Sequence, residues 1–358
     1  MSTPTYWDYL ALDRVLDAQG GLGGDPPSPD ELHFIIVHQT FELWFKLAIS
    51  QIRLARDHLA GPTLPEAQVP FVVHHLGRVN EVLRLCVEQF RVMETLPPQD
   101  FLDFRDKLTP SSGFQSFQMR EMEILLGLEE SQRVLLGGMD PLAHIRDLAA
   151  NSPTGAMAWG RIQTARGETT LRTALLRWLA RTPIQGSAAG AEHDDRVVEQ
   201  FMADYLTQVE VHQRSVARGL TTVLGDAEHA RIEARIAAGV AGTRSFLFPD
   251  DPAEKRARAA LVFIESYREL PLLAWPRLLL DTVVELEEQL LLFRNRHARM
   301  VERTIGRRVG TGGSSGVDYL DKTTTYRVFP ELWAVRSALL PRAYLPPLAQ
   351  PARYGFAG

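Results

Sequence analysis

The sequence lacks several features that would place it outside ordinary globular proteins. Cys86 is the only cysteine among 358 residues, which excludes an intrachain disulfide and a zinc cluster held by several thiolates. No apolar run approaches the roughly 20 residues that a membrane-spanning helix needs. The first residues also lack a cationic segment followed by an apolar stretch, so we expect no signal peptide and a reducing, cytoplasmic location.

An excess of basic residues is missing as well. Lys and Arg together number 39, Asp and Glu number 44, and the net charge is −5. We therefore expect no broad basic surface, and neither nucleic acid nor a membrane as a partner. With 45% hydrophobic and 23% charged residues, the composition is typical of a globular chain with a sizeable core.

Helical spacing of apolar residues dominates the patterned segments, and alternating strand-like runs do not stand out. The clearest helix is expected over residues 28–59, where Ser28 and Glu31 form a capping box and a Gly-Pro pair follows the end. Further helices are expected over residues 69–95, over 113–128 and from about Pro276 onward. The sequence predicts an all-α fold, an elaborated helical bundle formed as one domain over residues 1–358.

Two histidines lie in apolar helical faces. His38 shares a face with Phe34 and Phe41, and His297 lies in the stripe that includes Leu290 and Phe293. Taken singly, each is most simply a core histidine hydrogen-bonded to a carbonyl. Two of them on separate helices instead favour an interior metal or haem site. Zinc is the weaker choice because no HExxH motif is present, whereas haem needs one axial imidazole and an apolar slot.

Residues 310–316, GTGGSSG, form a glycine-rich segment. A phosphate-binding loop is disfavoured because the segment lacks the Lys-Ser/Thr ending and does not follow a strand. The segment is either a connector between helices or, because it begins 13 residues after His297, a cover over whatever His297 binds.

Arg105 lies among phenylalanines of the segment 101–114. One interpretation is a structural ion pair with Asp103 or Asp106. The other is a bidentate clamp on a substrate carboxylate, for which a guanidinium is better suited than an ammonium.

Four motifs join these candidates in one order along the chain: YWDYLALDRVLDAQ (6–19), DELHFIIVHQTFELWFK (30–46), DFRDKLTPSSGFQSFQMREME (103–123) and RNRHARMVERTIGRRVGTGGSSGVDYL (294–320). With them the sequence resembles the tryptophan 2,3-dioxygenase family over most of residues 6–128 and 260–345. Residues 145–255 are less similar.

The resemblance implies an enzyme that uses haem b, ferrous in its active form, and O2. Such an enzyme cleaves the indole C2–C3 bond of L-tryptophan to give N-formyl-L-kynurenine, the first step of the kynurenine pathway. It also implies a homotetramer, in which residues 1–27 form an N-terminal arm that contacts a neighbouring subunit.

The resemblance further implies roles for single residues. His297 would be the proximal ligand of the haem iron, and Ser112 and Gly113 would pass close to the haem. His38, the expected catalytic residue, would lie near the indole N–H. The other substrate contacts implied are Phe34, Phe101, Arg105, Thr311 and, from a neighbouring subunit, Tyr6, Tyr9 and Leu10.

Three residues depart from the family pattern. Trp7 stands where the family often has glycine, Met119 where an aromatic residue is usual, and His33 where leucine is common. Trp7 and the dissimilar residues 145–255 leave a second hypothesis, a haem monooxygenase of the same fold that acts on a modified tryptophan or another aromatic amino acid. A third hypothesis is a non-catalytic haem-binding or sensing protein, against which the retention of Arg105 and Thr311 argues.

Overall fold

The computed structural model describes residues 3, 5–20, 26–109, 111–135, 140–150, 152–221, 226–310 and 316–355. These residues form helices and connecting turns, with one isolated β-bridge between Ile184 and Ser187 and no strand among them. The prediction of an all-α fold is confirmed. None of the described helices has both the length and the apolar character needed to cross a membrane.

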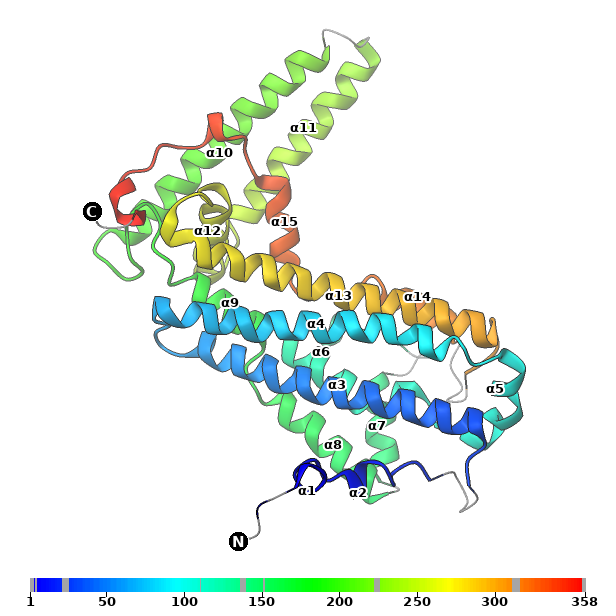
Figure 1. The fold of residues 1–358 in the computed structure, drawn as a ribbon. Coiled ribbons are helices and arrows are strands. Elements are labelled where there is room, and N and C mark those ends of the chain that lie inside the picture. Colours follow the sequence, from blue (N-terminus) through cyan, green and yellow to red (C-terminus); the bar gives the residue numbers. More distant parts are fainter. Residues whose placement is uncertain are drawn as a thin grey trace. The chain divides into compact units, whose positions relative to one another are not determined.

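The chain divides into two compact units (Figure 1). Unit 1 comprises residues 1–51, 78–168 and 288–326, and unit 2 comprises residues 52–77, 169–287 and 327–358. Three long helices contribute residues to both units: α3 (Pro29–Ala60), α4 (Val69–Met93) and α13 (Ala274–Ile305). The single domain expected over residues 1–358 stays a prediction.

The described residues of unit 1 also form seven shorter α-helices. They are α1 (Tyr6–Leu10), α2 (Leu12–Val15), α5 (Pro98–Arg105), α6 (Phe117–Leu126), α7 (Pro141–Ala149), α8 (Pro153–Arg166) and α14 (Val317–Thr323). The 3₁₀ turns of this unit are η3 (Asp106–Leu108), η4 (Gly113–Gln115) and η5 (Glu130–Gln132). Helix α8 packs against both α6 and α7.

Unit 2 is helical as well. Its α-helices are α9 (Leu171–Leu179), α10 (Asp194–Thr221), α11 (Asp226–Leu247), α12 (Pro252–Ser266) and α15 (Pro330–Ala338). Its 3₁₀ turns are η2 (Glu66–Gln68), η6 (Pro271–Leu273), η7 (Arg342–Tyr344) and η8 (Pro351–Tyr354). Helix α10 packs along α11, and α12 packs against α9 and α15.

Aromatic side chains join the long helices inside unit 1, where α3, α4 and α13 lie side by side (Figure 1). The ring of Phe41 on α3 lies 5.0 Å from that of Phe90 on α4 and 5.9 Å from that of Phe293 on α13. Phe90 and Phe293 lie 5.1 Å apart. All three rings are buried, so they fix the spacing of the three helices next to the cavity described below.

Candidate functional site

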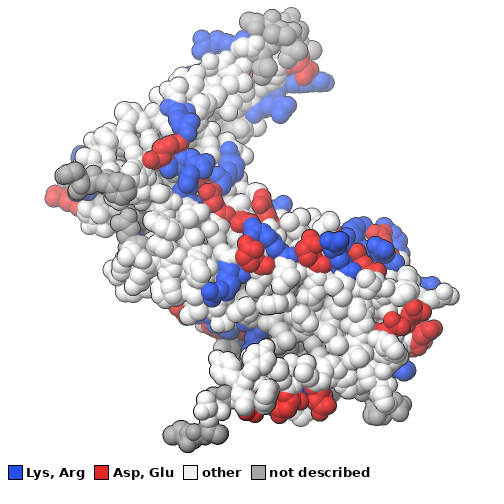
Figure 2. Space-filling model, in the orientation of Figure 1, with Lys and Arg blue, Asp and Glu red and all other residues white. Residues whose placement is uncertain are grey.

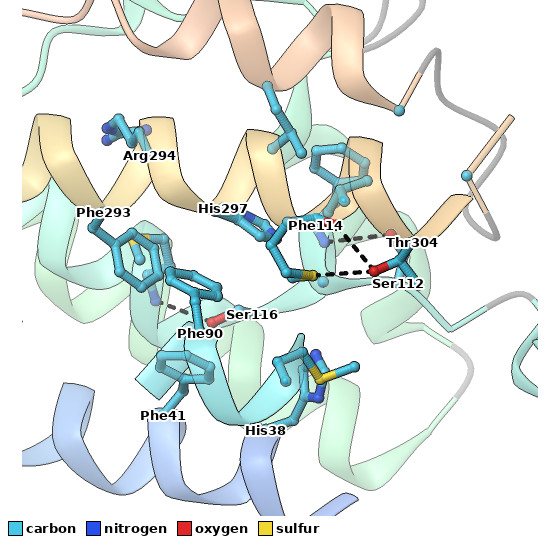
Figure 3. A pocket seen from close by; sticks show the side chains of 18 of the residues that line it. His38, Phe41, Phe90, Ser112, Phe114, Ser116, Phe293, Arg294, His297 and Thr304 are labelled. Carbon is cyan, nitrogen blue, oxygen red and sulfur yellow. Dashed lines mark hydrogen bonds between the residues drawn. The ribbon is translucent and has the colours of Figure 1, made fainter. Parts of the chain in front are cut away.

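A cavity in unit 1 brings the two singled-out histidines together. Its walls come from α3, α4, α5, α6, α13 and α14 and from the turn at residues 112–116. Figure 3 shows His38 reaching into the cavity from α3 and His297 from α13, on opposite sides. Much of the wall between them is aromatic, from Phe41, Phe90 and Phe293.

His297 is held by stacking. Its ring lies 5.6 Å from that of Phe90, with only 11° between the planes, and 6.1 Å from that of Phe293. Burial, followed by the charges of His38, Arg120 and Arg294, lowers the pKa of His297 to about 4. The imidazole is therefore neutral at pH 7, and in the described part of the chain neither ring nitrogen has a hydrogen-bond partner. A neutral imidazole of this kind is able to bind a metal.

One ring nitrogen of His38 is engaged in a hydrogen bond to the backbone. Its Nδ1 lies 2.8 Å from the carbonyl oxygen of Phe34, one turn earlier in α3. A carbonyl only accepts, so Nδ1 must carry the proton, and in the neutral ring Nε2 keeps a free lone pair. Burial lowers the pKa of His38, although the Phe34 carbonyl and Glu42 oppose this effect. His38 is therefore an acceptor facing the cavity at neutral pH.

Phe34 and Phe101 form an apolar wall beside His38. The Phe34 ring lies 4.1 Å from the His38 ring and 5.7 Å from the Phe101 ring. Both phenylalanines line the cavity, and Phe101 is buried. The structure thus brings Phe34, Phe101 and His38 together at one pocket.

Arg105 lies at the C-terminal end of α5 and also lines the cavity. Its guanidinium donates to the backbone carbonyl of Val309, just before the glycine-rich segment 310–316. No ion pair joins it to Asp103 or Asp106 within the described residues. The structure therefore does not support the interpretation of Arg105 as an ion-pair partner of these aspartates. The guanidinium is partly exposed and keeps N–H groups that can donate to a ligand.

Ser112 and Gly113 line the cavity at the start of η4. Ser112 caps this turn by accepting from the Phe114 N–H at 3.4 Å. A Cβ added at Gly113 would meet no atom within 4 Å, so open space lies above this backbone. Met119 on α6 is buried and lines the same cavity.

A sequence profile described as tryptophan 2,3-dioxygenase matches residues 1–339 of the chain. The chain belongs to the tryptophan 2,3-dioxygenase family. A tryptophan 2,3-dioxygenase 2 of Ralstonia nicotianae is 46% identical and covers 100% of this chain and 99% of the relative. A tryptophan 2,3-dioxygenase of Sorangium cellulosum is 43% identical over 98% of this chain and 87% of the relative. One from Anopheles gambiae is 33% identical over 96% and 87%.

Not every residue implied by the family resemblance lies at the cavity of this chain. Thr311 falls outside the described residues, although Gly310 and Gly316 on either side of its segment line the cavity. The side chains implied to come from a neighbouring subunit are on α1 and do not line it. They are exposed, and so is Trp7, which departs from the family pattern. The exposed fractions are 71% for Tyr6, 62% for Trp7, 81% for Tyr9 and 39% for Leu10.

The structure adds polar groups that the sequence interpretation missed. Glu42, one turn after His38 on α3, lines the cavity and accepts from Ser116 Oγ at 2.6 Å and Gln118 Nε2 at 2.7 Å. Arg120 and Arg294 line it as well. Glu42 could have been found from its spacing of four residues after His38, which places the two side chains on one helical face.

The residues present fit a haem. The cavity offers a neutral imidazole without a partner among the described residues, apolar walls and open space beside Gly113. One axial imidazole and an apolar slot are the minimal needs of a haem site. No group of three or more His, Cys, Asp or Glu side chains able to hold a metal ion occurs in the described part of the chain.

Proposed function

We propose that the chain is a haem-dependent dioxygenase that cleaves the indole C2–C3 bond of L-tryptophan with O2. The product would be N-formyl-L-kynurenine, which takes up both oxygen atoms, as in the first step of tryptophan catabolism through kynurenine. The observation that carries the proposal is the placement of His297, His38 and Arg105 around one apolar cavity of unit 1 in a member of this family.

His297 would hold the haem b through its imidazole, and Ser112 and Gly113 would contact it. When bound in the ferrous state, the haem would supply the site at which O2 binds and is activated. The stacked Phe90 ring keeps the His297 ring in one orientation. The surrounding apolar side chains exclude water from the place where the reaction occurs.

Tryptophan is a zwitterion, so a water-poor pocket has to supply a partner for each charge. Arg105 would donate to the carboxylate. Thr311 would contact the ammonium, and Phe34 and Phe101 would pack against the indole. These contacts fix both ends of the substrate, and fixed placement alone can lower a reaction barrier by several kcal/mol.

His38 would accept the indole N–H through Nε2. The hydrogen bond from Nδ1 to the Phe34 carbonyl selects the tautomer that leaves this lone pair free. Because an indole N–H is a very weak acid, His38 orients the ring rather than removing its proton. The tautomer is thus set by the backbone of α3.

Self-association would complete the site. We propose a homotetramer in which Tyr6, Tyr9 and Leu10 of one subunit reach the pocket of another. Their exposure in the single chain supports this. Apolar side chains on the outer faces of α3 and α4, such as Ile36, Leu43, Leu85 and Val92, are also exposed, and the face shown in Figure 2 carries few charges there.

Product analysis tests the proposal. The haem-loaded protein is incubated with L-tryptophan under O2, and the product is identified by mass. A gain of two oxygen atoms supports the dioxygenase, a gain of one supports a monooxygenase of the same fold, and no product contradicts both. His297→Ala should lose haem binding and activity, whereas His193→Ala, at an exposed histidine of unit 2, should keep both.

A further inference from the structure

A buried cluster of charges lies beside the cavity in unit 1. Glu123 of α6 contacts three guanidinium groups: Arg120 at 2.9 Å, Arg133 at 2.6 Å and Arg294 at 2.7 Å. None of these four side chains is more than 8% exposed. The interaction is therefore largely protected from screening by water and salt.

The cluster carries excess positive charge. Burial alone would raise the pKa of Glu123, but the three guanidinium groups overcome this effect and hold it at about 2. Three cations thus face one carboxylate, which leaves two positive charges in excess. In the described part of the chain no second carboxylate pairs with these arginines, and Arg133 Nε and Nη2 are buried without a hydrogen-bond partner.

Two tyrosines also lie against the cluster. The Arg294 guanidinium lies over the Tyr326 ring, 4.6 Å from its centre. Tyr319 lies against Arg120, and burial raises the pKa of Tyr319 to about 12, so this phenol is neutral. Aromatic faces attract the cations but do not cancel their charge.

Two of the three arginines reach the cavity. Arg120 and Arg294 line it, and Arg294 lies one helical turn before His297 on α13. The other charged groups of the cavity wall are Glu42, near His38, and Arg105, at the end of α5. The excess charge is therefore close to the imidazole that would hold the haem.

An uncompensated buried charge lowers the stability of the fold, and apolar side chains of similar size would make a more stable core. We propose that the excess positive charge of the Arg120–Arg133–Arg294–Glu123 cluster stabilises ferrous over ferric iron in the haem held by His297, and so raises its reduction potential. The inference rests on the proposed haem site. Reduction adds one electron, from an external one-electron donor, and the nearby cations favour that added negative charge.

The cluster has a second consequence for the axial ligand. A carboxylate that accepts the free N–H of an axial histidine makes the imidazole a stronger donor. Glu123, the buried carboxylate of the cluster, is fully engaged by arginines, and His297 has no carboxylate partner among the described residues. Both effects act in the same direction, toward the ferrous state that O2 binding requires.

Reduction potentials of haem-loaded variants test the inference. Arg294→Met and Arg120→Met each remove one positive charge while Glu123 keeps two partners, so we expect both proteins to fold. Each should shift the ferrous–ferric equilibrium at least tenfold toward ferric, which is about 59 mV for one electron. Arg294→Lys keeps the charge and should retain most of the potential.

Arg161→Met is the matched control. Arg161 of α8 pairs at 2.7 Å with Glu121, which lies on α6 like Arg120 and Glu123. Arg161 does not line the cavity, so removing its charge should leave the reduction potential unchanged. The potentials are read by spectroelectrochemical titration with dithionite and mediators, and thermal unfolding is recorded alongside.

Two failures are distinguishable. If the wild-type protein takes up no haem, the proposed function is wrong and the inference falls with it. If wild type and Arg294→Met both bind haem with an absorption spectrum typical of one axial histidine but have equal potentials, only the inference is wrong. A lowered melting temperature with an unchanged potential would show that the cluster is structural.

Discussion

At the scale of single residues, Arg105 is the most direct test of substrate recognition. Replacing it with Met should raise the KM for L-tryptophan roughly 30- to 150-fold, because a hydrogen bond to a charged group contributes about 2–3 kcal/mol. Arg105→Lys should recover part of this loss, since an ammonium keeps the charge but not the fork. Initial rates over a range of tryptophan concentrations measure the effect.

The control for Arg105 is Arg91→Met. Arg91 pairs with Glu88 on the exposed face of α4 and does not line the cavity, so its KM should equal that of wild type. An unchanged KM in Arg105→Met would show that the guanidinium binds only the Val309 carbonyl.

His38 gives a prediction about pH. Burial lowers its pKa below the ordinary 6.5, so Nε2 stays unprotonated at neutral pH and becomes protonated only as the pH falls through the lowered value. The decrease of kcat/KM for tryptophan in acid should therefore have its midpoint below pH 6.5.

The pH profile of His38→Ala separates this residue from the others. Its kcat/KM should be lower throughout and should lack the decrease in acid that His38 causes, because kcat/KM reports groups of the free enzyme. If the variant keeps the same acid limb as wild type, another group causes it, and the proposed role of Nε2 as an acceptor is wrong.

At the scale of elements, α6 depends on Glu123. Glu123→Gln would leave three buried guanidinium groups without their anion, and breaking a buried pair in this way costs about 3–5 kcal/mol. Urea unfolding of the haem-free protein measures the loss. Glu130→Gln, at an exposed pair with Arg166, should cost less than about 1 kcal/mol.

Glu123 also makes stability depend on pH. Its pKa of about 2 in the folded protein lies below the reference value of 4.5, so its contribution is complete above pH 4.5 and is lost as the pH falls toward 2. Because one pKa unit corresponds to about 1.4 kcal/mol, the contribution is about 3 kcal/mol. The free energy of unfolding should decrease less with acid in Glu123→Gln than in wild type.

Local patterns predicted the long helices well. The capping box predicted a start at Ser28, and the Ser28 hydroxyl does accept from the Glu31 N–H at 3.2 Å. Residues 113–128 were expected as one helix, yet η4 ends before Ser116, and α6 begins at Phe117. Ser116 leaves the helical region and caps α6 through its side chain, a choice that apolar spacing does not reveal.

Long-range polar contacts could not be predicted from local patterns. The partner of Arg105 is a backbone carbonyl 204 residues away, although Asp103 and Asp106 lie within two residues of it. Arg294 meets Glu123 across 171 residues. The periodic spacing of apolar residues indicates which face of each helix is buried. Which charged side chains form buried pairs depends on how the helices pack, and the local sequence carries no signal for that.

At the scale of the whole molecule, the first two helices carry the proposed contact with a neighbouring subunit. Helices α1 and α2 have no buried residues. Large exposed apolar side chains are typical of surfaces that another protein covers. The proposed homotetramer would cover Tyr6 and Tyr9 by placing them at a neighbour's pocket. Each active site would then need residues from two subunits.

Two inactive variants should restore each other. His297→Ala would lack haem but keep an intact arm, while the double variant Tyr6→Ser, Tyr9→Ser would hold haem but offer no complete arm. When both are produced in one cell, random assembly of subunits should give haem and an intact neighbouring arm at about one site in four. Tryptophan turnover by the purified mixed oligomers should then exceed the sum of the two separate variants. Turnover no greater than that sum would mean that the arm serves its own subunit or no site at all.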